Sequence, residues 1–316
     1  MSAVNDRSTR ILRGVVVWLL AALAACDSSG GNIAEPLPDA RSLCLSPACG
    51  ARQLIVDLPQ LENIAYTSNG RLFVSGQQNL YEITRDSEGY QSRALFENAG
   101  GCSGLTEQRG HLYALCPGGL HAVALDDPQA QPVLVSALSG FTLPNGLAAG
   151  ADHRLYVADG PIALDPKIVR LQLDPEDPLR LLNQEVWLRT LPEFPNGLAI
   201  RDGRLYTTLY VPPLGTVAAI DIAPDGSAGA IQRLALRGIL DDLAVYGESL
   251  LIADFQNGAL LQTDLDGTVL QQTGALSFMQ PSSVEVAGPP LFDEPTVLAT
   301  ERYLGRGLWA WVVSKD

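Results

Sequence analysis

Six segments of this 316-residue sequence carry a polar side chain at the same place in a repeated phrase. Two segments read Pro-Asn-Gly-Leu-Ala, from Pro144 and from Pro195, and each is followed by a turn and by Arg-Leu-Tyr. Alignment on the two asparagines brings four further segments into register. The residues at the register position are Glu62, Ser103, Asn145, Asn196, Asp241 and Ser282. Two carboxylates and two amides in this set are oxygen donors of the kind that a hard cation prefers.

The spacing of these positions predicts the fold. They are 41, 42, 51, 45 and 41 residues apart, which is the length of a four-stranded propeller blade. Each unit has an apolar segment, a turn such as Asn69-Gly70 and an alternating run such as Arg-Leu-Tyr-Val, which together indicate a hairpin. Two further strand-like runs follow. We therefore predict an all-β protein that forms a six-bladed β-propeller with four-stranded blades, because an unrelated β-sandwich would not explain six repeats in phase.

The two ends of the repeat predict how the ring closes. The sixth unit ends after its third strand, at Val313, while an extra strand at residues 52–58 precedes the first unit. We expect residues 52–58 to complete the last blade, so that no sheet edge stays open. The predicted propeller domain therefore covers residues 51–316.

The first strand of a propeller blade lines the central channel, so the six register residues should form a ring at one mouth. We predict a divalent cation there, Ca²⁺ before Mg²⁺. Its ligands would be Glu62, Asn145, Asn196 and Asp241. Without a cation, two facing carboxylates would repel each other and lose solvation. Asn63 and Asp242 are expected to add ligands or supporting hydrogen bonds. The alternative is that these residues form turns and that water fills the channel.

Chain direction predicts which side chains surround the mouth. The loops between the second and third strands of each blade emerge at the same end as the register residues, and they contain Tyr210, Phe255, Arg302 and Tyr303. We expect a small ring-shaped ester or sugar lactone to bind here. The predicted contacts are Ser103, Asn145, Tyr210, Phe255 and Arg302. The alternative is that the aromatic rings pack between the blades.

These residues resemble a known family. The repeated Pro-Asn-Gly-Leu-Ala, the acidic register residue of the first unit and the Asp of the fifth are similar to the calcium-dependent six-bladed propellers of the regucalcin/gluconolactonase (senescence marker protein-like) family, with paraoxonases as distant relatives. The resemblance covers the whole predicted propeller. It implies that Glu62, Asn196 and Asp241 bind the metal and that Asn145 binds metal or substrate. It also implies that Asp241 is the general base of a lactone hydrolysis.

The sequence departs from that family in two places. The fifth phrase is Leu240-Asp241-Asp242 instead of Pro-Asp-Gly, and the catalytic histidine of the paraoxonases would fall on Ser103. The three histidines lie in or beside strands and turns, where we expect structural or solvated roles: His111, His121 and His153. We therefore keep two hypotheses. One is a metal-dependent hydrolase of lactones or related small esters. The other is a non-catalytic binding propeller with a structural metal. A lyase is a third class.

The N-terminus has the features of an export signal. Arg7, Arg10 and Arg13 precede an apolar run, Gly14–Ala25, that is too short to span a bilayer comfortably. Its end, Leu-Ala-Ala-Cys26, resembles the lipobox of bacterial lipoproteins. We predict a signal peptide at residues 1–25, a lipid on Cys26 and a flexible tether over residues 26–50. The protein would then face the periplasm, with Asp27 indicating the inner membrane. The alternatives are an ordinary signal peptide or a short membrane anchor.

Four cysteines remain after Cys26, which is an even number and indicates disulfides in an exported protein. We favour two local pairs, Cys44 with Cys49 and Cys102 with Cys116, and free thiols are the alternative. No Cys/His spacing typical of zinc sites occurs.

The net charge limits the partners. The chain has 21 basic and 35 acidic residues; loss of the signal removes three Arg and one Asp, leaving 18 and 34, a net charge of −16. This acidity argues against nucleic acid and anionic headgroups as partners. We expect a monomer that binds a small molecule and contacts the membrane only through its lipid.

Overall fold

The computed structural model describes residues 43–316 except 97–99, 161–163, 191, 212–213 and 314–316. Over these residues the chain forms 24 β-strands and no helix. The described part accordingly has no helix with the length and hydropathy of a membrane-spanning segment. The predicted signal peptide, Cys26 and the tether up to residue 42 lie outside the described residues.

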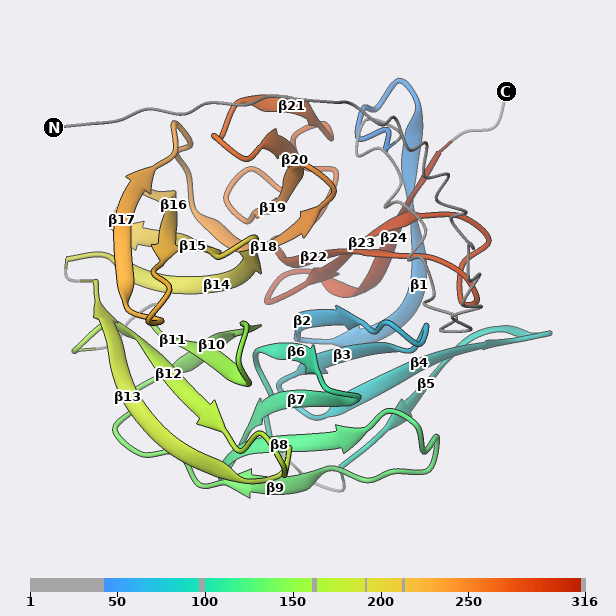
Figure 1. The fold of residues 1–316 in the computed structure, drawn as a ribbon. Coiled ribbons are helices and arrows are strands. Elements are labelled where there is room, and N and C mark those ends of the chain that lie inside the picture. Colours follow the sequence, from blue (N-terminus) through green and yellow to red (C-terminus); the bar gives the residue numbers. More distant parts are fainter. Residues whose placement is uncertain (1–42, 97–99, 161–163, 191, 212–213, 314–316) are drawn as a thin grey trace, which may run out of the picture. The chain divides into compact units, whose positions relative to one another are not determined.

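The strands form six antiparallel sheets of four strands, arranged as the blades of a propeller (Figure 1). Blade 1 consists of β2 (Leu61–Tyr66), β3 (Leu72–Gly76), β4 (Leu80–Asp86) and β5 (Gly89–Ala94). Blade 2 consists of β6 (Leu105–Gln108), β7 (His111–Cys116), β8 (Gly119–Ala124) and β9 (Val133–Ser136). Blade 3 consists of β10 (Pro144–Ala149), β11 (Arg154–Asp159), β12 (Lys167–Leu173) and β13 (Leu181–Arg189).

The remaining blades repeat this pattern. Blade 4 consists of β14 (Phe194–Arg201), β15 (Arg204–Val211), β16 (Leu214–Ile222) and β17 (Ala228–Arg233). Blade 5 consists of β18 (Leu240–Tyr246), β19 (Ser249–Asp254), β20 (Ala259–Asp264) and β21 (Val269–Gln272). Blade 6 consists of β22 (Pro281–Ala287), β23 (Thr296–Glu301), β24 (Arg306–Val313) and β1 (Gly50–Pro59). The predicted fold and blade composition are confirmed.

The ring closes as predicted, through an N-terminal strand. β1 is the outer strand of blade 6 and pairs antiparallel with β24, with Gly50 opposite Val313. The residues just before β1 also pack on the propeller, although they fall in the predicted tether. The Leu45 N–H donates to Gln271 Oε1 at 3.1 Å, and Leu45 itself is fully buried. The segment from residue 43 is therefore fixed against blade 5.

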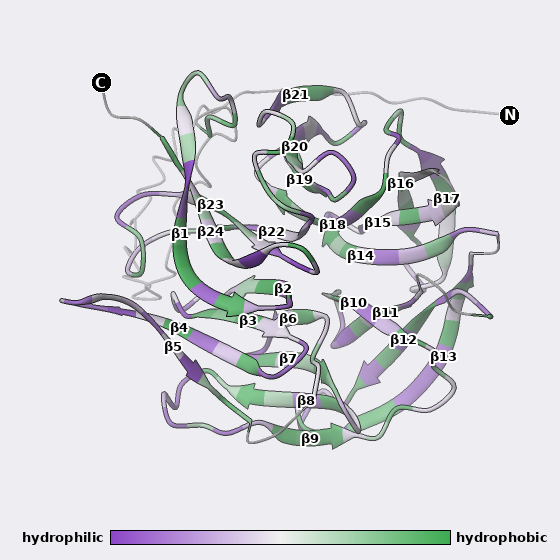
Figure 2. Cartoon of the chain, turned by 180° about the vertical axis from the view of Figure 1, so that it is seen from behind, coloured by the Kyte–Doolittle hydropathy of each residue, from purple (hydrophilic) through white to green (hydrophobic). Residues whose placement is uncertain are grey.

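Each pair of neighbouring blades encloses a hydrophobic cluster. Between blades 2 and 3, for example, Tyr113 and Leu115 of β7 pack with Leu147 of β10 and Val157 of β11. The second strands of the blades pack on both faces, so that all six residues of β19 are buried. Figure 2 shows hydrophobic and hydrophilic stretches along β13 and β14. The packing fixes the blades and leaves the ends of the inner strands to form the channel mouth.

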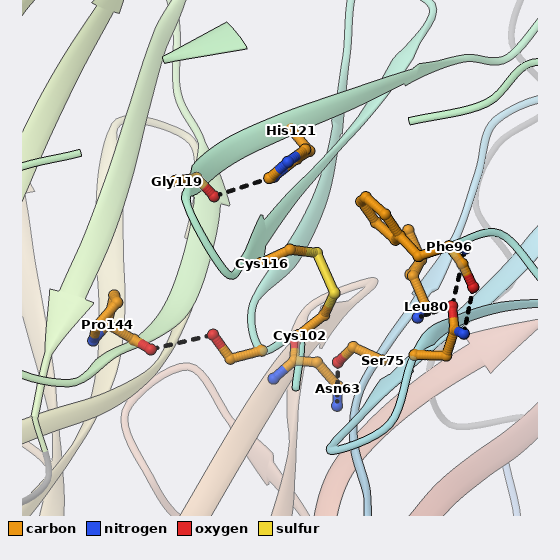
Figure 3. The surroundings of a disulfide bond; sticks show 11 residues. Asn63, Ser75, Leu80, Phe96, Cys102, Cys116, Gly119, His121 and Pro144 are labelled. Carbon is orange, nitrogen blue, oxygen red and sulfur yellow. Dashed lines mark hydrogen bonds between the residues drawn. A yellow bond between two sulfur atoms is a disulfide. The ribbon is translucent and has the colours of Figure 1, made fainter. Parts of the chain in front are cut away.

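Both predicted disulfides are confirmed: Cys44 bonds Cys49, and Cys102 bonds Cys116. The second bond joins the segment before β6 to the end of β7, beside the buried ring of His121 (Figure 3). It therefore constrains the approach to the inner strand of blade 2.

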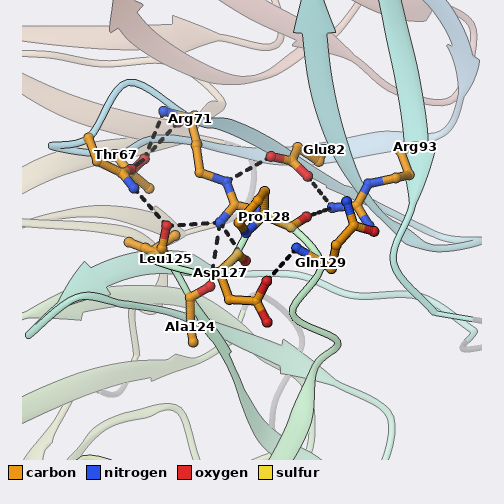
Figure 4. A network of polar contacts seen from close by, with 10 residues as sticks. Thr67, Arg71, Glu82, Arg93, Ala124, Leu125, Asp127, Pro128 and Gln129 are labelled. Atoms are coloured by element: carbon orange, nitrogen blue, oxygen red, sulfur yellow. Dashed lines mark hydrogen bonds and ion pairs between the residues drawn. The ribbon is translucent and has the colours of Figure 1, made fainter.

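An ion-pair network holds blade 1 against blade 2 on its outer side (Figure 4). The carboxylate of Glu82 binds Arg71 and Arg93, and both arginines also donate to backbone carbonyls of the loop after β8. Burial alone would raise the pKa of Glu82, but hydrogen bonds from the two arginines lower it below its usual value. This carboxylate is therefore ionised and structural.

Candidate functional site

Five of the six register residues sit at a β-bulge or register irregularity at the start of an inner strand; one of them is Ser282, between the paired residues Pro281 and Ser283 of β22. In β2, Glu62 and Asn63 together lie opposite a single residue of β3, Ser75. The same irregularity recurs in β10, β14 and β18. The bulged pairs there are Asn145-Gly146, Asn196-Gly197 and Asp241-Asp242. A bulge bends the strand and changes where its side chains point.

The bulges direct the first residue of each pair toward a common cavity. This cavity, which we call the mouth cavity, has a volume of about 680 Å³ and is lined by Glu62, Asn145, Asn196 and Asp241. The second residues of two pairs, Asn63 and Asp242, instead line a channel cavity of about 310 Å³ between the six inner strands. Asn63 and Asp242 thus line the channel cavity and not the mouth cavity, and their expected part in a metal site, as ligands or as support, stays a prediction.

The glycine of the repeated phrase has a packing role. A Cβ atom on Gly146 would overlap the carbonyl oxygen of Asn196, and one on Gly197 would overlap the side chain of Asp242. Neighbouring inner strands therefore approach closely only because these positions lack a side chain. Asn145 and Asn196 lie within β10 and β14, so their interpretation as turn formers is wrong.

Buried hydroxyl groups satisfy the backbone atoms that the bulges leave unpaired. The Gly197 N–H donates to Thr208 Oγ1 at 2.8 Å, and that hydroxyl donates to the Asp241 carbonyl at 2.7 Å. Ser75 Oγ accepts the Asn63 N–H at 3.0 Å (Figure 3). The sequence analysis missed these residues, although a hydroxyl within the otherwise apolar second strand was a usable signal.

The polar side chains of the mouth cavity contact one another in pairs. Asn145 Nδ2 donates to Glu62 Oε1 at 3.4 Å, and Asn196 Nδ2 donates to Asp241 Oδ1. Arg302 Nη1 forms an ion pair with Glu62 Oε2. Two buried atoms in this group have neither a hydrogen-bond partner nor an ion pair: Asn196 Oδ1 and Arg302 Nε. The cavity floor thus holds an unsatisfied amide oxygen next to the Asp241 carboxylate.

Burial dominates the electrostatics of this floor. It raises the pKa of Glu62 to about 7, although Arg302 and Asn145 act in the opposite direction. Burial, followed by the charges of Glu62 and Asp242, raises the pKa of Asp241 well above its usual value. Asp242 also has a pKa raised by burial, to about 6. Burial therefore makes both floor carboxylates harder to ionise than an ordinary carboxylate, and Glu62 titrates near neutral pH.

Some of the remaining predicted site residues line the mouth cavity and others do not. Ser103, Tyr210, Phe255 and Arg302 all line the mouth cavity. Ser282 does not line the mouth cavity, and its hydroxyl donates to the Leu61 carbonyl of the neighbouring blade 1 at 3.0 Å. None of the three histidines lines the mouth cavity.

The sequence analysis missed a further part of the cavity wall. Leu138, Phe141 and Leu143 precede β10, and Ile239 precedes β18; all four line the mouth cavity. They lie on connections from an outer strand to the next inner strand, whereas the prediction considered only the loops between second and third strands. Apolar residues directly before the register phrase were the available signal.

Several solved protein structures have a fold similar to that of this propeller. A protein assigned as a gluconolactonase matches with a TM-score of 0.64 and 17% identity, over 88% of this chain and 97% of that one. A gluconolactonase from Xanthomonas campestris matches with a TM-score of 0.61 and 17% identity, over 84% and 90%. Regucalcin from Agrobacterium tumefaciens, a calcium-binding protein, matches with a TM-score of 0.61 and 12% identity, over 87% and 97%.

The chain shares its fold with gluconolactonases and regucalcin. The fold implied by the sequence resemblance is thereby confirmed, and identities this low show the fold alone. No protein-family model and no curated protein match the chain. The chemistry has to be argued from the mouth cavity itself.

Replacing Thr208 by Val should test the support of the bulge. Val keeps the shape of Thr but leaves the Gly197 N–H and the Asp241 carbonyl unpaired, so the free energy of unfolding should fall by about 2–4 kcal/mol in urea denaturation. The matched control is Thr207→Val, which removes one hydrogen bond, to the Thr208 carbonyl, away from the bulge. Equal losses in the two variants would contradict the role given to Thr208.

Acidification should stabilise the protein when a chelator removes divalent cations. Because the folded-state pKa of Glu62 is raised to about 7, above its unfolded value, the folded state binds more protons between pH 5 and pH 8. Stability should therefore fall as pH rises, by about 2 kcal/mol between pH 5.5 and pH 8 from Glu62 alone. Urea denaturation across this range measures it, and Glu62→Gln should flatten the profile. A stability that rises with pH in wild type would show that the assignment is wrong.

Proposed function

We propose that this protein is a divalent-cation-dependent hydrolase of lactones or related small esters, with Ca²⁺ as the expected ion. The observation that carries the proposal is the convergence of two carboxylates and two amides on one buried floor. These floor residues are Glu62, Asn145, Asn196 and Asp241. The shared fold with a gluconolactonase and with a calcium-binding regucalcin supports the same chemistry.

The floor fits a hard cation. Its donors are all oxygens, it holds two buried carboxylates, and the buried Asn196 Oδ1 lacks a hydrogen-bond partner. The described residues contain no group of three His, Cys, Asp or Glu side chains suited to a metal. The proposed set has only two such residues and relies on amides for the rest. A positive charge here would favour the ionised forms of Glu62 and Asp241, whose pKa values burial raises.

Glu62, Asn196 and Asp241 would hold the cation, and Asn145 would bind the cation or the substrate. A bound divalent cation would polarise the carbonyl group of the substrate. Asp241 would accept a proton as a water oxygen bonds to the carbonyl carbon, and its raised pKa makes its carboxylate a stronger base. The acyl–oxygen bond then breaks, and the proton held by Asp241 passes to the departing oxygen. Ser103, Tyr210, Phe255 and Arg302 would surround the substrate.

One observation favours a second candidate, a non-catalytic binding propeller with a structural cation. The position of the paraoxonase-type histidine holds Ser103, whose hydroxyl already donates to the Pro144 carbonyl at 3.0 Å. In that case the cation would hold the blades together at the floor, and its removal would lower the melting temperature without loss of any activity.

We also propose that Cys26 carries a lipid, that the protein faces the periplasm and that it is a monomer.

The first test compares two neighbouring aspartates in a lactone assay. Chelator should abolish hydrolysis by wild type and Ca²⁺ should restore it. Asp241→Asn should lower kcat by at least about 100-fold, because the proposed base is lost. Asp242→Asn is the control, since Asp242 faces the channel cavity, and its kcat should change by less than about tenfold. Lactone hydrolysis that is absent, or insensitive to chelator, would overturn the proposal.

The second test concerns Arg302, which forms an ion pair with Glu62. Cation binding has to compete with this ion pair, so Arg302→Gln should bind Ca²⁺ about tenfold more tightly than wild type in calorimetry at pH 7.5. Arg306→Gln is the matched control, because Arg306 pairs with Asp57 on the surface of the same blade. Equal or weaker Ca²⁺ binding by Arg302→Gln would show that the Arg302 guanidinium and Ca²⁺ do not compete for Glu62.

A further inference from the structure

The mouth cavity combines a polar floor with apolar walls. The walls consist of carbon-rich side chains from two sides of the ring, Leu138, Phe141, Leu143, Ile239, Phe255 and Tyr303. The first three precede β10 of blade 3, and the last three belong to blades 5 and 6. At about 680 Å³ the cavity is in the range of sites that enclose drug-sized ligands. It therefore has room beyond the part that covers the floor.

Part of the apolar surface of the walls stays exposed and is not buried by packing between blades. Leu143 keeps 38% of its surface exposed and Tyr303 keeps 55%. The Tyr303 ring meets the Phe255 ring edge-on, with centroids 6.0 Å apart. The next residue in the chain, Leu304, is 79% exposed. Exposed apolar surface around a cavity is a feature of binding sites.

Hydrogen bonds to a buried carboxylate hold the backbone of the wall segment before β10. The fully buried carboxylate of Asp159 accepts the N–H groups of Thr142 and Leu143, at 2.9 and 2.7 Å for its Oδ1. The buried Lys167 Nζ balances that carboxylate at 2.9 Å. A charged pair removed from water therefore holds the backbone of an apolar wall segment. Such a preformed wall lowers the ordering cost of ligand binding.

Most of the wall surface is apolar, although Gln77, Ser103 and Tyr210 also line the cavity. A sugar lactone would place some of its hydroxyl groups against carbon, where each loses hydrogen bonds to water without replacement. The surroundings instead suit a molecule with one carbonyl group, few other polar groups and an apolar substituent.

We propose that the substrate of the mouth cavity is a lactone or ester that carries an apolar chain, with its carbonyl group over the floor and its chain along Phe141 and Leu143. This inference rests on the proposed function and names its substrate class. It distinguishes the chain from an enzyme for polyhydroxylated sugar lactones.

The direct experiment measures kcat/KM of the Ca²⁺-loaded protein for γ-butyrolactone, γ-hexalactone, γ-decalactone and glucono-δ-lactone. Each methylene buried against the wall should raise kcat/KM about fourfold. We expect γ-decalactone to exceed γ-butyrolactone by at least about 50-fold and to exceed glucono-δ-lactone as well. A preference for glucono-δ-lactone, or indifference to chain length, overturns the inference.

A matched pair of variants locates the effect. Leu143→Asn should lower kcat/KM for γ-decalactone at least about tenfold and change that for γ-butyrolactone less than about twofold, because only the long chain reaches this side chain. Leu134→Asn is the control: Leu134 is 56% exposed on β9 and does not line the mouth cavity. Equal effects of Leu143→Asn on both lactones would contradict the placement of the chain.

Binding of 3-hexylcyclopentanone separates this inference from the proposed function. This ketone replaces the ring oxygen of γ-decalactone by a methylene and cannot be hydrolysed. Calorimetry should show that it binds wild type and that Leu143→Asn weakens binding about tenfold. If it binds in this way while no lactone is hydrolysed, the hydrolase proposal fails and the apolar site stands. If it does not bind, or binds the variant equally well, the apolar site is wrong.

Discussion

The β-bulge at the start of the inner strands is the constraint on which the rest of this structure depends. A regular strand would send successive side chains to opposite faces of the blade, into the packing between neighbours. The extra residue instead sends Glu62 and Asp241 to the mouth cavity and their successors, Asn63 and Asp242, to the channel cavity. Gly146 and Gly197 let adjacent bulges approach, and the Thr208 hydroxyl connects two of them. The polar floor is therefore a product of backbone geometry.

This geometry concentrates acidic groups where water is scarce. Burial raises the pKa of Glu62 to about 7 and that of Asp241 well above its usual value, so ionising both is unfavourable in the absence of added positive charge. Arg302 supplies one such charge, through its ion pair with Glu62. The charge of Arg302 also lowers the pKa of Asp241, but the buried Asn196 Oδ1 has no hydrogen-bond partner. A divalent cation on this floor would add positive charge beside both carboxylates and bind this oxygen, which is the physical core of the proposed function.

The sequence predicted the parts of this arrangement that repeat. Spacing near 45 residues gave the blades, and in-phase polar residues identified the four floor positions, because equivalent residues of a closed ring must face one axis. Prediction from the sequence failed where the backbone departs from regular strand pairing. Asn-Gly allowed a turn, whereas the bulge keeps Asn145 and Asn196 within strands. It also failed for contacts between distant segments. Neither the Arg302–Glu62 ion pair nor the wall before β10 has a local signature, since each depends on how different blades meet.

The most direct measurement is a crystal structure of the protein grown with millimolar Ca²⁺, with the anomalous signal used to identify the ion. The account predicts one ion in the mouth cavity, with oxygens of Glu62, Asn196 and Asp241 at about 2.3–2.6 Å from it. Arg302 should then have left Glu62. A mouth cavity without an ion, with Arg302 still paired to Glu62, would contradict the central claim.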